Sequence, residues 1–235
     1  MCCLIAFLVM IMLKINNVFS KYKKSEVLRG ISFEVHAGDA VALIGPNGVG
    51  KTTLLKVMAG LIPVSQGDVL WNERSIYKFP IQCGALIEES KYYPNLSGGE
   101  NIQMIQSFDA SLEPDKNLIE KLKMTELLHK KCNSYSLGMR KKLGLILATM
   151  GNPKYLLLDE PQNGLDYDGI EVLRWKISEH RQNGGVVVLA SHDTTEISRI
   201  CNRALFLRNG EIAQEIPVTG NPEVLDIVYK GVFNV

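Results

Sequence analysis

The sequence has no apolar run long enough to cross a lipid bilayer. Its apolar N-terminus, MCCLIAFLVMIML, ends at Leu13, whereas a membrane-spanning helix needs about 20 such residues. The N-terminus also lacks the basic leading region and the small-residue cleavage site of a signal peptide. We therefore expect neither a transmembrane helix nor a cleaved leader.

Residues 1–11 are expected to be an apolar extension outside the folded domain, which we place at 12–235. The stretch LKINNV, from Leu13 onward, has the pattern of a first strand, and the residues before it have no partner in the fold proposed below. We therefore expect translation to begin at Met12. The alternative is a short tail that contacts a membrane surface.

Paired cysteines and an excess of charge are also absent. The five cysteines form no CxxC or Cys/His metal spacing, and Cys2 and Cys3 are neighbours that would not ordinarily bridge. This usage is typical of a reducing compartment. With 26 basic and 25 acidic residues the net charge is +1, so the charge balance gives no sign of a nucleic-acid partner, and we expect none.

Apolar patterning predicts a mixed α/β fold. ISFEVH at 31–36 alternates as a half-buried strand does, whereas VALI at 41–44 is a continuous buried run. After a glycine-rich turn, KTTLLKVMAGLI has helical spacing, and Asn209 and Gly210 are well suited to a hairpin turn. The predicted strands are 13–18, 31–36, 41–44, 155–159, 186–190 and two within 204–216; the predicted helices begin at 51 and lie near 168–182 and 194–201.

Residues 91–150 are mostly helical in pattern and are predicted to form a separate subdomain. Within them, LIEKLKMTELLHK at 118–130 is the clearest amphipathic segment. The expected architecture is therefore a strand–helix core interrupted by an inserted helical subdomain. The sequence shows no internal repeat, low-complexity tract or linker.

A phosphate-binding loop is the most specific pattern in the chain. GPNGVGKTT at 45–53 fits G-x-x-x-x-G-K-[ST] and lies between a buried strand and a helix, as that motif requires. Glycines let backbone N–H groups turn toward phosphate oxygens at the positive end of the helix. The alternative is a turn that only caps a helix. The predicted nucleotide ligands here are Gly45, Pro46, Asn47, Gly48, Val49, Gly50, Lys51, Thr52 and Thr53.

Two adjacent acids end an otherwise apolar strand. In YLLLDEP, Asp159 would lie next to a metal ion, and Glu160 would polarise the attacking water. Stability does not explain such a pair, because burying a charge costs several kcal/mol unless it is paired or bound to metal. Lys51 would hold the β- and γ-phosphates and Thr52 would bind Mg²⁺, so the chain is predicted to be a nucleoside triphosphatase.

The order of these motifs resembles that of the ATP-binding subunit of ABC transporters, over nearly the whole chain from Met12. The resemblance implies a P-loop NTPase fold with a RecA-like core, an antiparallel β subdomain and an inserted helical subdomain. The elements in order are an aromatic residue (Tyr22), the phosphate loop, the helical region, a signature, the Asp159–Glu160 strand end, NGLD at 163–166, and His192.

Two stretches compete for the family signature, LSGGE at 96–100 and YSLGM at 135–139. In this family the signature lies a little over twenty residues before the strand-end aspartate. Ser136 precedes Asp159 by 23 residues and Ser97 precedes it by 62, which favours YSLGM. LSGGE has a local explanation, since Ser97 and Glu100 form an S-x-x-E capping box. Ser136 is likewise expected to cap a helix.

The resemblance implies further roles. Tyr22 would stack on adenine, although packing is an alternative for it. Ser136, Gly138 and Met139 would contact the γ-phosphate held by a second subunit. Asp166 would lie at the dimer interface, or cap the following helix, or both. His192 would reach the γ-phosphate or the attacking water, so the catalytic set is Glu160, His192 and Lys51.

Two positions depart from the family pattern. Leu137 occupies a usual signature glycine, and Glu88 stands where many relatives have glutamine. A carboxylate at 88 can still face Mg²⁺ but cannot donate a hydrogen bond, so the expected metal set is Thr52, Asp159 and Glu88. Together with the YPNL…EN context, these departures resemble the bacterial bacitracin-resistance and lantibiotic-immunity transporters.

The implied function is MgATP hydrolysis by a homodimer that powers a separate membrane permease. The protein would act peripherally at the cytoplasmic face of a bacterial membrane, in export of antimicrobial peptides or immunity to them. We expect Tyr92, Tyr93 and Pro94 to line a groove for a permease helix, with ordinary loop packing as the alternative. A soluble ABC-type ATPase or a non-hydrolysing ATP switch are the alternative functions.

Overall fold

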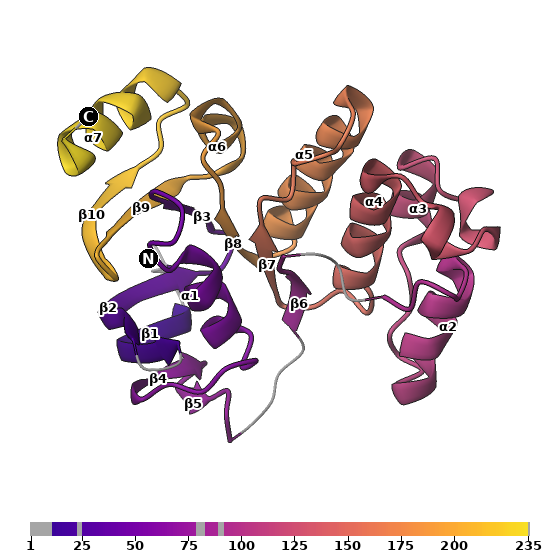
Figure 1. Cartoon of the computed structure of the whole chain (residues 1–235), viewed down its shortest axis with the longest axis horizontal. Helices are drawn as coiled ribbons and strands as arrows, with labels where there is room; N and C mark the ends of the chain where they lie inside the picture. The colour runs from indigo at the N-terminus through magenta and orange to yellow at the C-terminus, as the bar shows by residue number, and fades with distance from the viewer. Residues whose placement is uncertain (1–10, 23–24, 79–82, 89–91, 235) are drawn as a thin grey trace, which may run out of the picture.

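A computed structural model describes residues 11–22, 25–78, 83–88 and 92–234. Two sheets form its β structure, one of four antiparallel strands and one of six strands, most of them parallel. Figure 1 shows the helical region at the end of the molecule opposite the antiparallel sheet. Among the helices of the described residues, none is both long and apolar enough to cross a membrane. The expectations for residues 1–10 fall outside the described residues.

The antiparallel sheet has the order β2-β1-β4-β5. Its strands are β1 (Ile11–Tyr22), β2 (Ser25–His36), β4 (Gln66–Trp71) and β5 (Arg74–Ser75). The strands predicted at 13–18 and 31–36 lie within β1 and β2, which are longer than predicted. Strands β4 and β5 were not predicted, because QGDVLW is too short and too polar at its start to show a clear alternation.

The second sheet has the order β10-β9-β3-β8-β7-β6. Strands β3, β6, β7, β8 and β9 pair in parallel, and β10 joins β9 in antiparallel fashion. Every residue of β3, β7 and β8 is buried, in agreement with their continuous apolar runs. The strands are β3 (Ala40–Ile44), β6 (Cys83–Leu86), β7 (Tyr155–Asp159), β8 (Val186–Ala190), β9 (Arg203–Arg208) and β10 (Glu211–Pro217).

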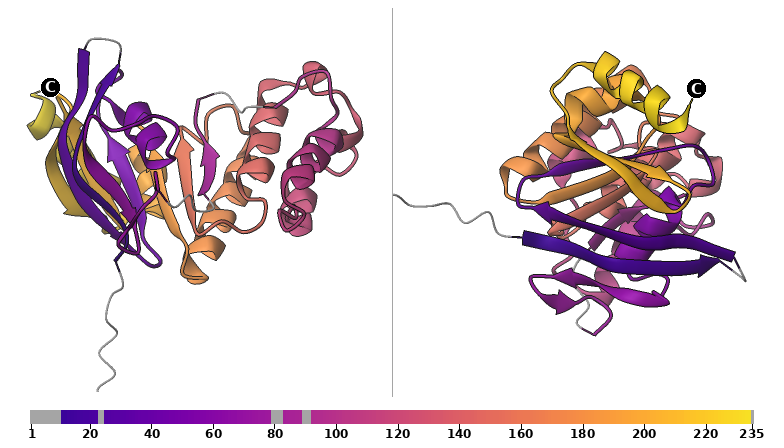
Figure 2. Two further views of the ribbon diagram at one scale, coloured as in Figure 1. Left: turned by 90° about the horizontal axis from the view of Figure 1, so that it is seen from below. Right: turned by 90° about the vertical axis from the view of Figure 1, so that its left-hand side faces the viewer.

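This sheet separates two apolar cores. On one face, Leu157 and its neighbours pack with α1 (Lys51–Met58) and the antiparallel sheet. On the other face, Leu156 and Leu158 pack with α5 (Tyr167–Gln182), α6 (Thr194–Ile200) and the helical region. Alternate side chains of β7 point to opposite faces of a sheet, so one strand contributes to both cores. Figure 2 shows the antiparallel sheet and the helical region at opposite ends.

The region predicted to be helical contains α2 (Gly98–Phe108), α3 (Lys116–Lys121), α4 (Leu137–Ala148) and two 3-10 turns, Leu127–His129 and Cys132–Ser134. The amphipathic segment 118–130 is not one helix, which corrects the expectation from its pattern. Lys123 has a φ of 57°, and Met124 N–H donates to the Ile119 carbonyl at 3.0 Å. This left-handed turn ends α3 at Lys121, although the apolar pattern alone would continue the helix.

The C-terminal part contains the predicted hairpin and one helix that was not predicted. Asn209 and Gly210 connect β9 to β10 with φ values of 53° and 81°, as expected for this turn. The chain then forms α7 (Pro222–Phe233), which begins at the cap Asn221 with proline at its first turn. Figure 1 shows α7 close to α6 and the β9–β10 hairpin.

Candidate nucleotide-binding site

The phosphate loop joins the end of β3 to the start of α1, as predicted. Gly50 caps α1 with a φ of 115°, a conformation that residues with a side chain rarely adopt. Gly45 lies so close to β9 that a Cβ there would be 2.6 Å from the Leu207 carbonyl oxygen. Both glycines are therefore required by the backbone path. The N-terminus of α1 faces the loop and favours a bound anion.

Lys51 lies over this loop and is only 7% exposed. Its Nζ donates to the Gly45 carbonyl at 2.7 Å and to the Pro46 carbonyl at 3.1 Å. Burial lowers the pKa of Lys51 below its usual value, while the nearby carboxylates Glu160 and Asp159 act in the opposite direction. The ammonium group is thus held beside the loop, where its positive charge can neutralise the negative charge of a bound phosphate.

Thr52 and Asp159 meet although they are far apart in the sequence. The Thr52 hydroxyl donates to Asp159 Oδ2 at 2.7 Å. Asp159 is the last residue of β7 and is 8% exposed. The parallel alignment of β7 with β8 and β6 brings the end of this strand to the phosphate loop. Two hard oxygen ligands therefore lie side by side, as the sequence predicted.

Glu160 and His192 form a second pair. The His192 Nδ1 and Glu160 Oε1 atoms are 2.9 Å apart, and Gln162 Nε2 lies 3.3 Å from Glu160 Oε2. Glu160 has a φ of 45°, and its N–H donates to the Ala190 carbonyl at 2.9 Å. This backbone turn after β7 directs the side chain toward the loop that follows β8. The sequence predicted both residues as catalytic but did not predict their contact.

Lys51, Thr52, Asp159 and Glu160 line a cavity of about 710 Å³. Its lining includes most of the predicted ligands and several residues that sequence reasoning missed, among them Lys56 and Lys141. Neither lysine belongs to a recognisable motif. Lys56 lies on α1 and Lys141 on α4, and the packing of these helices places both at the cavity. The lining residues in the described part are Val27, Asn47, Gly48, Gly50, Lys51, Thr52, Thr53, Lys56, Ile62, Glu88, Lys141, Asp159 and Glu160.

The first residues of α4 do not line this cavity in the described part of the chain, although Lys141 does. Ser136 caps α4, and its hydroxyl accepts the Met139 N–H at 3.3 Å. Leu137 is 58% exposed and packs on Gly164. A Cβ added at Gly164 would lie 2.9 Å from the Leu137 Cγ atom. Gly138 is equally close, because a Cβ there would lie 2.7 Å from the Gly164 carbonyl oxygen. The loop before α5 is thereby packed against the N-terminus of α4.

Asp166 also belongs to this contact. It caps α5 by accepting the Gly169 N–H at 3.0 Å, and its carboxylate pairs with Lys142 of α4 at 3.1 Å. The capping role that the sequence allowed for Asp166 is confirmed. The hydrogen bond from Lys142 lowers the pKa of Asp166 below its usual value, so the side chain is held as a carboxylate.

Comparison with known proteins identifies the family. Residues 28–163, which span the phosphate loop, the helical region and the Asp159–Glu160 strand end, match the ABC transporter family. The chain belongs to the ABC transporter family. It is an ATP-binding subunit of the ATPase class, as the resemblance of its motifs predicted.

The relatives of this ABC ATPase include proteins of peptide-antibiotic transport. The lantibiotic transport ATP-binding protein SrtF of Streptococcus pyogenes is 31% identical over 92% of this chain and 95% of its own length. The bacitracin transport ATP-binding protein BcrA of Enterococcus faecalis is 32% identical over 87% of this chain and 68% of its own length. The expected subgroup is therefore confirmed.

Solved structures support the same fold. The ATP-binding subunit of an ABC transporter superposes with a TM-score of 0.86 at 24% identity, covering 94% of this chain and 99% of the other. An ATP-binding cassette solved as a dimer after hydrolysis, with ADP and Pi, gives a TM-score of 0.78 at 23% identity, covering 89% of this chain and 100% of the other. The α/β ABC ATPase fold is thereby confirmed.

Two predicted ligands of the ABC ATPase site need separate mention. The side chain of Tyr22 lies outside the described residues, so its stacking on adenine stays a prediction. Glu88 lines the nucleotide cavity, but its carboxylate is 2.6 Å from Lys56 Nζ. Coordination of Mg²⁺ by Glu88 also stays a prediction. The carboxylate would then interact with both the metal ion and Lys56.

The LSGGE stretch has the capping role that the sequence predicted. Ser97 Oγ accepts the Glu100 N–H at 3.1 Å, and Glu100 Oε2 accepts the Ser97 N–H at 2.6 Å. These two bonds are the reciprocal pair of a capping box at the start of α2. Backbone and side-chain hydrogen bonds to Ser97 lower the pKa of Glu100. LSGGE therefore has a local role as the start of α2.

Replacing each of the two capping serines with alanine should separate the signature from the local cap. Both changes remove a helix N-cap, and each is expected to cost about 1 kcal/mol of unfolding free energy. Ser97→Ala should keep wild-type ATP hydrolysis, whereas Ser136→Ala should lower it roughly 10²-fold, the usual effect of losing one preorganised donor. Phosphate release and thermal unfolding of both variants provide the measurement. Equal ATPase rates in the two variants would contradict the assignment of YSLGM as the signature.

Proposed function

We propose that this chain hydrolyses MgATP as a homodimer and thereby powers a separate membrane permease that handles antimicrobial peptides. The observation that carries the proposal is the convergence of Lys51, the Thr52–Asp159 pair and Glu160 around one cavity, with His192 in contact with Glu160. Their chemical types match the tasks of phosphoryl transfer: charge neutralisation, metal placement and orientation of water.

Thr52 and Asp159 fit a magnesium ion. Mg²⁺ prefers oxygen ligands and keeps several waters and phosphate oxygens, so it needs only one or two protein groups. Thr52 and Asp159 supply these two groups here, since the Thr52 hydroxyl and Asp159 Oδ2 are 2.7 Å apart. When bound, the ion would neutralise charge on the phosphates.

The remaining residues would then act on the phosphates and the water. Lys51 and the N–H groups of the phosphate loop would bind the β- and γ-phosphates. Glu160 would orient the attacking water and take its proton, because its carboxylate lies next to the cavity at the end of β7. His192 would hold the Glu160 carboxylate through the contact at 2.9 Å.

Completion of the site by a second subunit is supported by the position of the signature. Ser136, Gly138, Met139 and Asp166 do not line the nucleotide cavity of their own chain in its described part. They lie instead on the linked surface formed by the start of α4 and the loop before α5. A relative of the same fold was solved as a dimer after hydrolysis. We therefore infer a head-to-tail dimer in which this surface faces the partner's phosphate loop.

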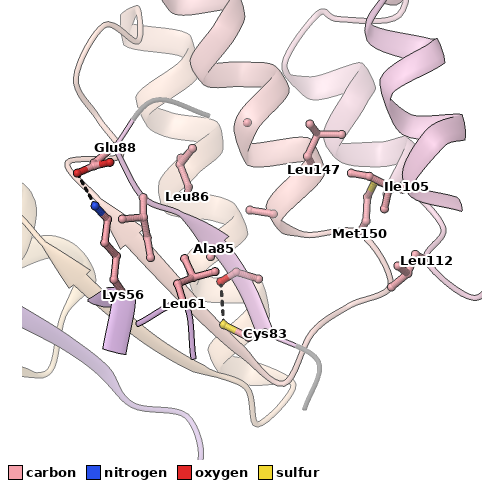
Figure 3. A pocket seen from close by; sticks show the side chains of 14 residues that line it. Lys56, Leu61, Cys83, Ala85, Leu86, Glu88, Ile105, Leu112, Leu147 and Met150 are labelled. Atoms are coloured by element: carbon pink, nitrogen blue, oxygen red, sulfur yellow. Dashed lines mark hydrogen bonds and ion pairs between the residues drawn. The ribbon is translucent and has the colours of Figure 1, made fainter. Parts of the chain in front are cut away.

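An apolar cavity of about 490 Å³ beside β6 is the proposed docking site of the permease. Figure 3 shows apolar side chains of the β6 strand facing others from α2 and α4, with the Lys56–Glu88 pair at one end. That pair also lines the nucleotide cavity, so a docked segment would lie next to groups that contact nucleotide. The apolar side chains with labels in the figure are Leu61, Cys83, Ala85, Leu86, Ile105, Leu112, Leu147 and Met150.

Tyr92 and Tyr93 do not line this cavity in the described part of the chain. Tyr92 packs against the core of the helical region, and Tyr93 is 57% exposed. Their expected contact with a permease helix therefore rests on the sequence pattern alone. The peptide substrate is proposed from SrtF and BcrA, whose names specify lantibiotic and bacitracin transport. Action at the cytoplasmic membrane face follows from the same proposal.

A complementation experiment tests this function. A strain lacking the chain should become more sensitive to bacitracin or to a lantibiotic, and the wild-type gene should restore resistance. Leu61→Asp, which places a charge in the docking cavity at a 65% exposed position, should keep phosphate release by the purified protein but fail to restore resistance. The matched control is Ile227→Asp, at a 70% exposed position of α7 outside that cavity.

The outcomes separate the rival functions. Unchanged sensitivity of the deletion strain to both kinds of peptide would contradict the substrate proposal. Resistance restored by Leu61→Asp would contradict docking at this cavity. Absence of phosphate release from the wild-type protein with MgATP would instead support a non-hydrolysing ATP switch.

A further inference from the structure

The Glu160 carboxylate has a hydrogen-bond partner at each of its two oxygens. Oε1 lies 2.9 Å from His192 Nδ1, and Oε2 accepts a hydrogen bond from Gln162 Nε2 at 3.3 Å. The two partners differ in exposure, since the His192 side chain is 70% exposed whereas Gln162 is half-buried. An exposed polar contact is weak because water competes for both of its members. Gln162 is therefore the better protected partner of the carboxylate.

Gln162 is itself held by a buried residue. Its Nε2 atom also donates to Ser191 Oγ at 2.5 Å, and Ser191 is only 1% exposed. The Ser191 hydroxyl oxygen accepts the Asp193 N–H as well, at 3.1 Å. A glutamine amide has two N–H donors, so Gln162 can use one on Glu160 and the other on the loop after β8. Its side chain thereby links the loops that follow two neighbouring strands, β7 and β8.

The chemistry of Glu160 determines which end of the Gln162 amide faces it. An ionised carboxylate only accepts hydrogen bonds, so the NH₂ end of the amide must face Oε2. A side chain at 162 without a donor would leave this oxygen free to turn. One with a negative charge would repel it.

The backbone at Gln162 is fixed by a tight turn. Pro161 is buried and restricts its own φ. The Asn163 N–H donates to the Glu160 carbonyl at 3.2 Å, and the Leu165 N–H donates to the Gln162 carbonyl at 3.1 Å. The side chain of Gln162 therefore starts from a defined backbone position, and little further ordering is needed when nucleotide binds.

Gln162 lies behind the proposed base rather than at the nucleotide. Glu160 lines both the nucleotide cavity and a second cavity, of about 480 Å³, to which His192 and Tyr229 of α7 also contribute. In the described part of the chain, Gln162 lines neither of these two cavities. An effect of Gln162 on catalysis would therefore pass through Glu160.

We propose that Gln162 is a positioning residue for ATP hydrolysis, which holds the Glu160 carboxylate in place while Ser191 braces its amide. The proposal rests on the role of base proposed above for Glu160. A base must stay within hydrogen-bond reach of the proton that it takes, and a misplacement of about 1 Å in an active site costs on the order of 10²-fold in rate. Holding Oε2 limits rotation of the carboxylate and so limits such misplacement.

Steady-state phosphate release by the purified full-length protein with MgATP tests the proposal. Gln162→Met, which is similar in size but has no donor, should lower kcat about tenfold, the effect of losing one hydrogen bond to a charged group. The KM for ATP should change less than about twofold, because the phosphate-binding groups are untouched. Gln162→Glu has the shape of the wild-type side chain but places a second carboxylate beside Glu160, so its kcat should fall at least as far.

The matched control is Gln182→Met, which removes a glutamine–serine hydrogen bond, from Gln182 to Ser178, at the C-terminal end of α5. This control should keep the wild-type kcat. Rates are referred to the fraction of each protein that binds a fluorescent ATP analogue, so that partial unfolding does not count as a lower kcat. An unchanged kcat in Gln162→Met would overturn the proposal. A fall in kcat matched by an equal weakening of ATP binding would overturn it too.

A double-mutant cycle tests the bracing by Ser191. Ser191→Ala should lower kcat several-fold in the wild-type protein but less than about twofold in Gln162→Met, because the two residues act through one contact. Losses that simply multiply would show that Ser191 does not act through Gln162, and would contradict the proposed brace. Failure of the underlying site is recognised separately, because Glu160→Gln would then keep wild-type turnover.

Discussion

Glu160→Gln is expected to lower the rate of ATP hydrolysis by roughly 10²- to 10⁴-fold, the usual contribution of a general base, while ATP binding is kept. Glutamine has nearly the same size and can still pair with His192, but it cannot accept the proton of the attacking water. The phosphate loop, Lys51 and the Thr52–Asp159 pair are unchanged in this variant. The nucleotide should therefore bind and remain intact, and the protein should accumulate as an ATP-bound dimer.

Three measurements check this expectation: phosphate release, binding of a fluorescent ATP analogue, and size-exclusion chromatography with MgATP. The matched control is Glu100→Gln, which changes an exposed carboxylate of the α2 capping box. That control should keep wild-type turnover. Wild-type turnover in Glu160→Gln itself would refute the assignment of Glu160 as the base.

Glu160→Gln has a second expected effect, on Lys51. The Glu160 carboxylate raises the pKa of Lys51 against the larger lowering effect of burial. Removing its charge should therefore lower the pKa of Lys51 further.

Lys51→Ala should instead weaken nucleotide binding itself, by at least about tenfold, because one charge-assisted hydrogen bond contributes about 1.5–3 kcal/mol. The ammonium is 7% exposed and already lies within hydrogen-bond distance of the loop carbonyls of Gly45 and Pro46. To bind a phosphate, the Lys51 ammonium only has to exchange a carbonyl oxygen for a phosphate oxygen as its hydrogen-bond acceptor. Without it, only Mg²⁺ and the loop N–H groups would compensate the negative charge of the β- and γ-phosphates next to Asp159 and Glu160.

Titration with a fluorescent ATP analogue measures this loss, and thermal unfolding without nucleotide shows whether the loop still folds. Lys154→Ala is the matched control, because Lys154 is an exposed lysine outside the nucleotide cavity. Wild-type affinity for ATP in Lys51→Ala would contradict the assigned role. Equal weakening in Lys154→Ala would indicate a general effect of net charge.

Prediction from sequence succeeded where neighbouring residues determine the structure. The phosphate loop follows from glycines that permit the backbone conformation at Gly50 and the close approach at Gly45. The hairpin at Asn209–Gly210 and the capping roles of Ser97, Ser136 and Asp166 are likewise decided within a few residues. In the hairpin and the caps the energetically important contact spans about three positions, so a short pattern contains it.

The same reasoning failed where a local pattern was overruled. The apolar spacing of 118–130 continues past Leu122, yet the chain turns at Lys123 with a positive φ. The turn directs Met124, which is fully buried, into the core of the helical region. Burial of that side chain against distant residues outweighs the continuation of one helix.

The sequence by itself determined the family, through the order and spacing of its motifs, and the α/β class, the phosphate loop and the acidic strand end, through patterns of residues close together in the chain. Only the tertiary structure decided that His192 contacts Glu160 and that α7 brings Tyr229 to the cavity beside them. These contacts join segments separated by tens of residues or more. They depend on how the strands order in the sheet and how α7 packs on β9, which no local pattern specifies.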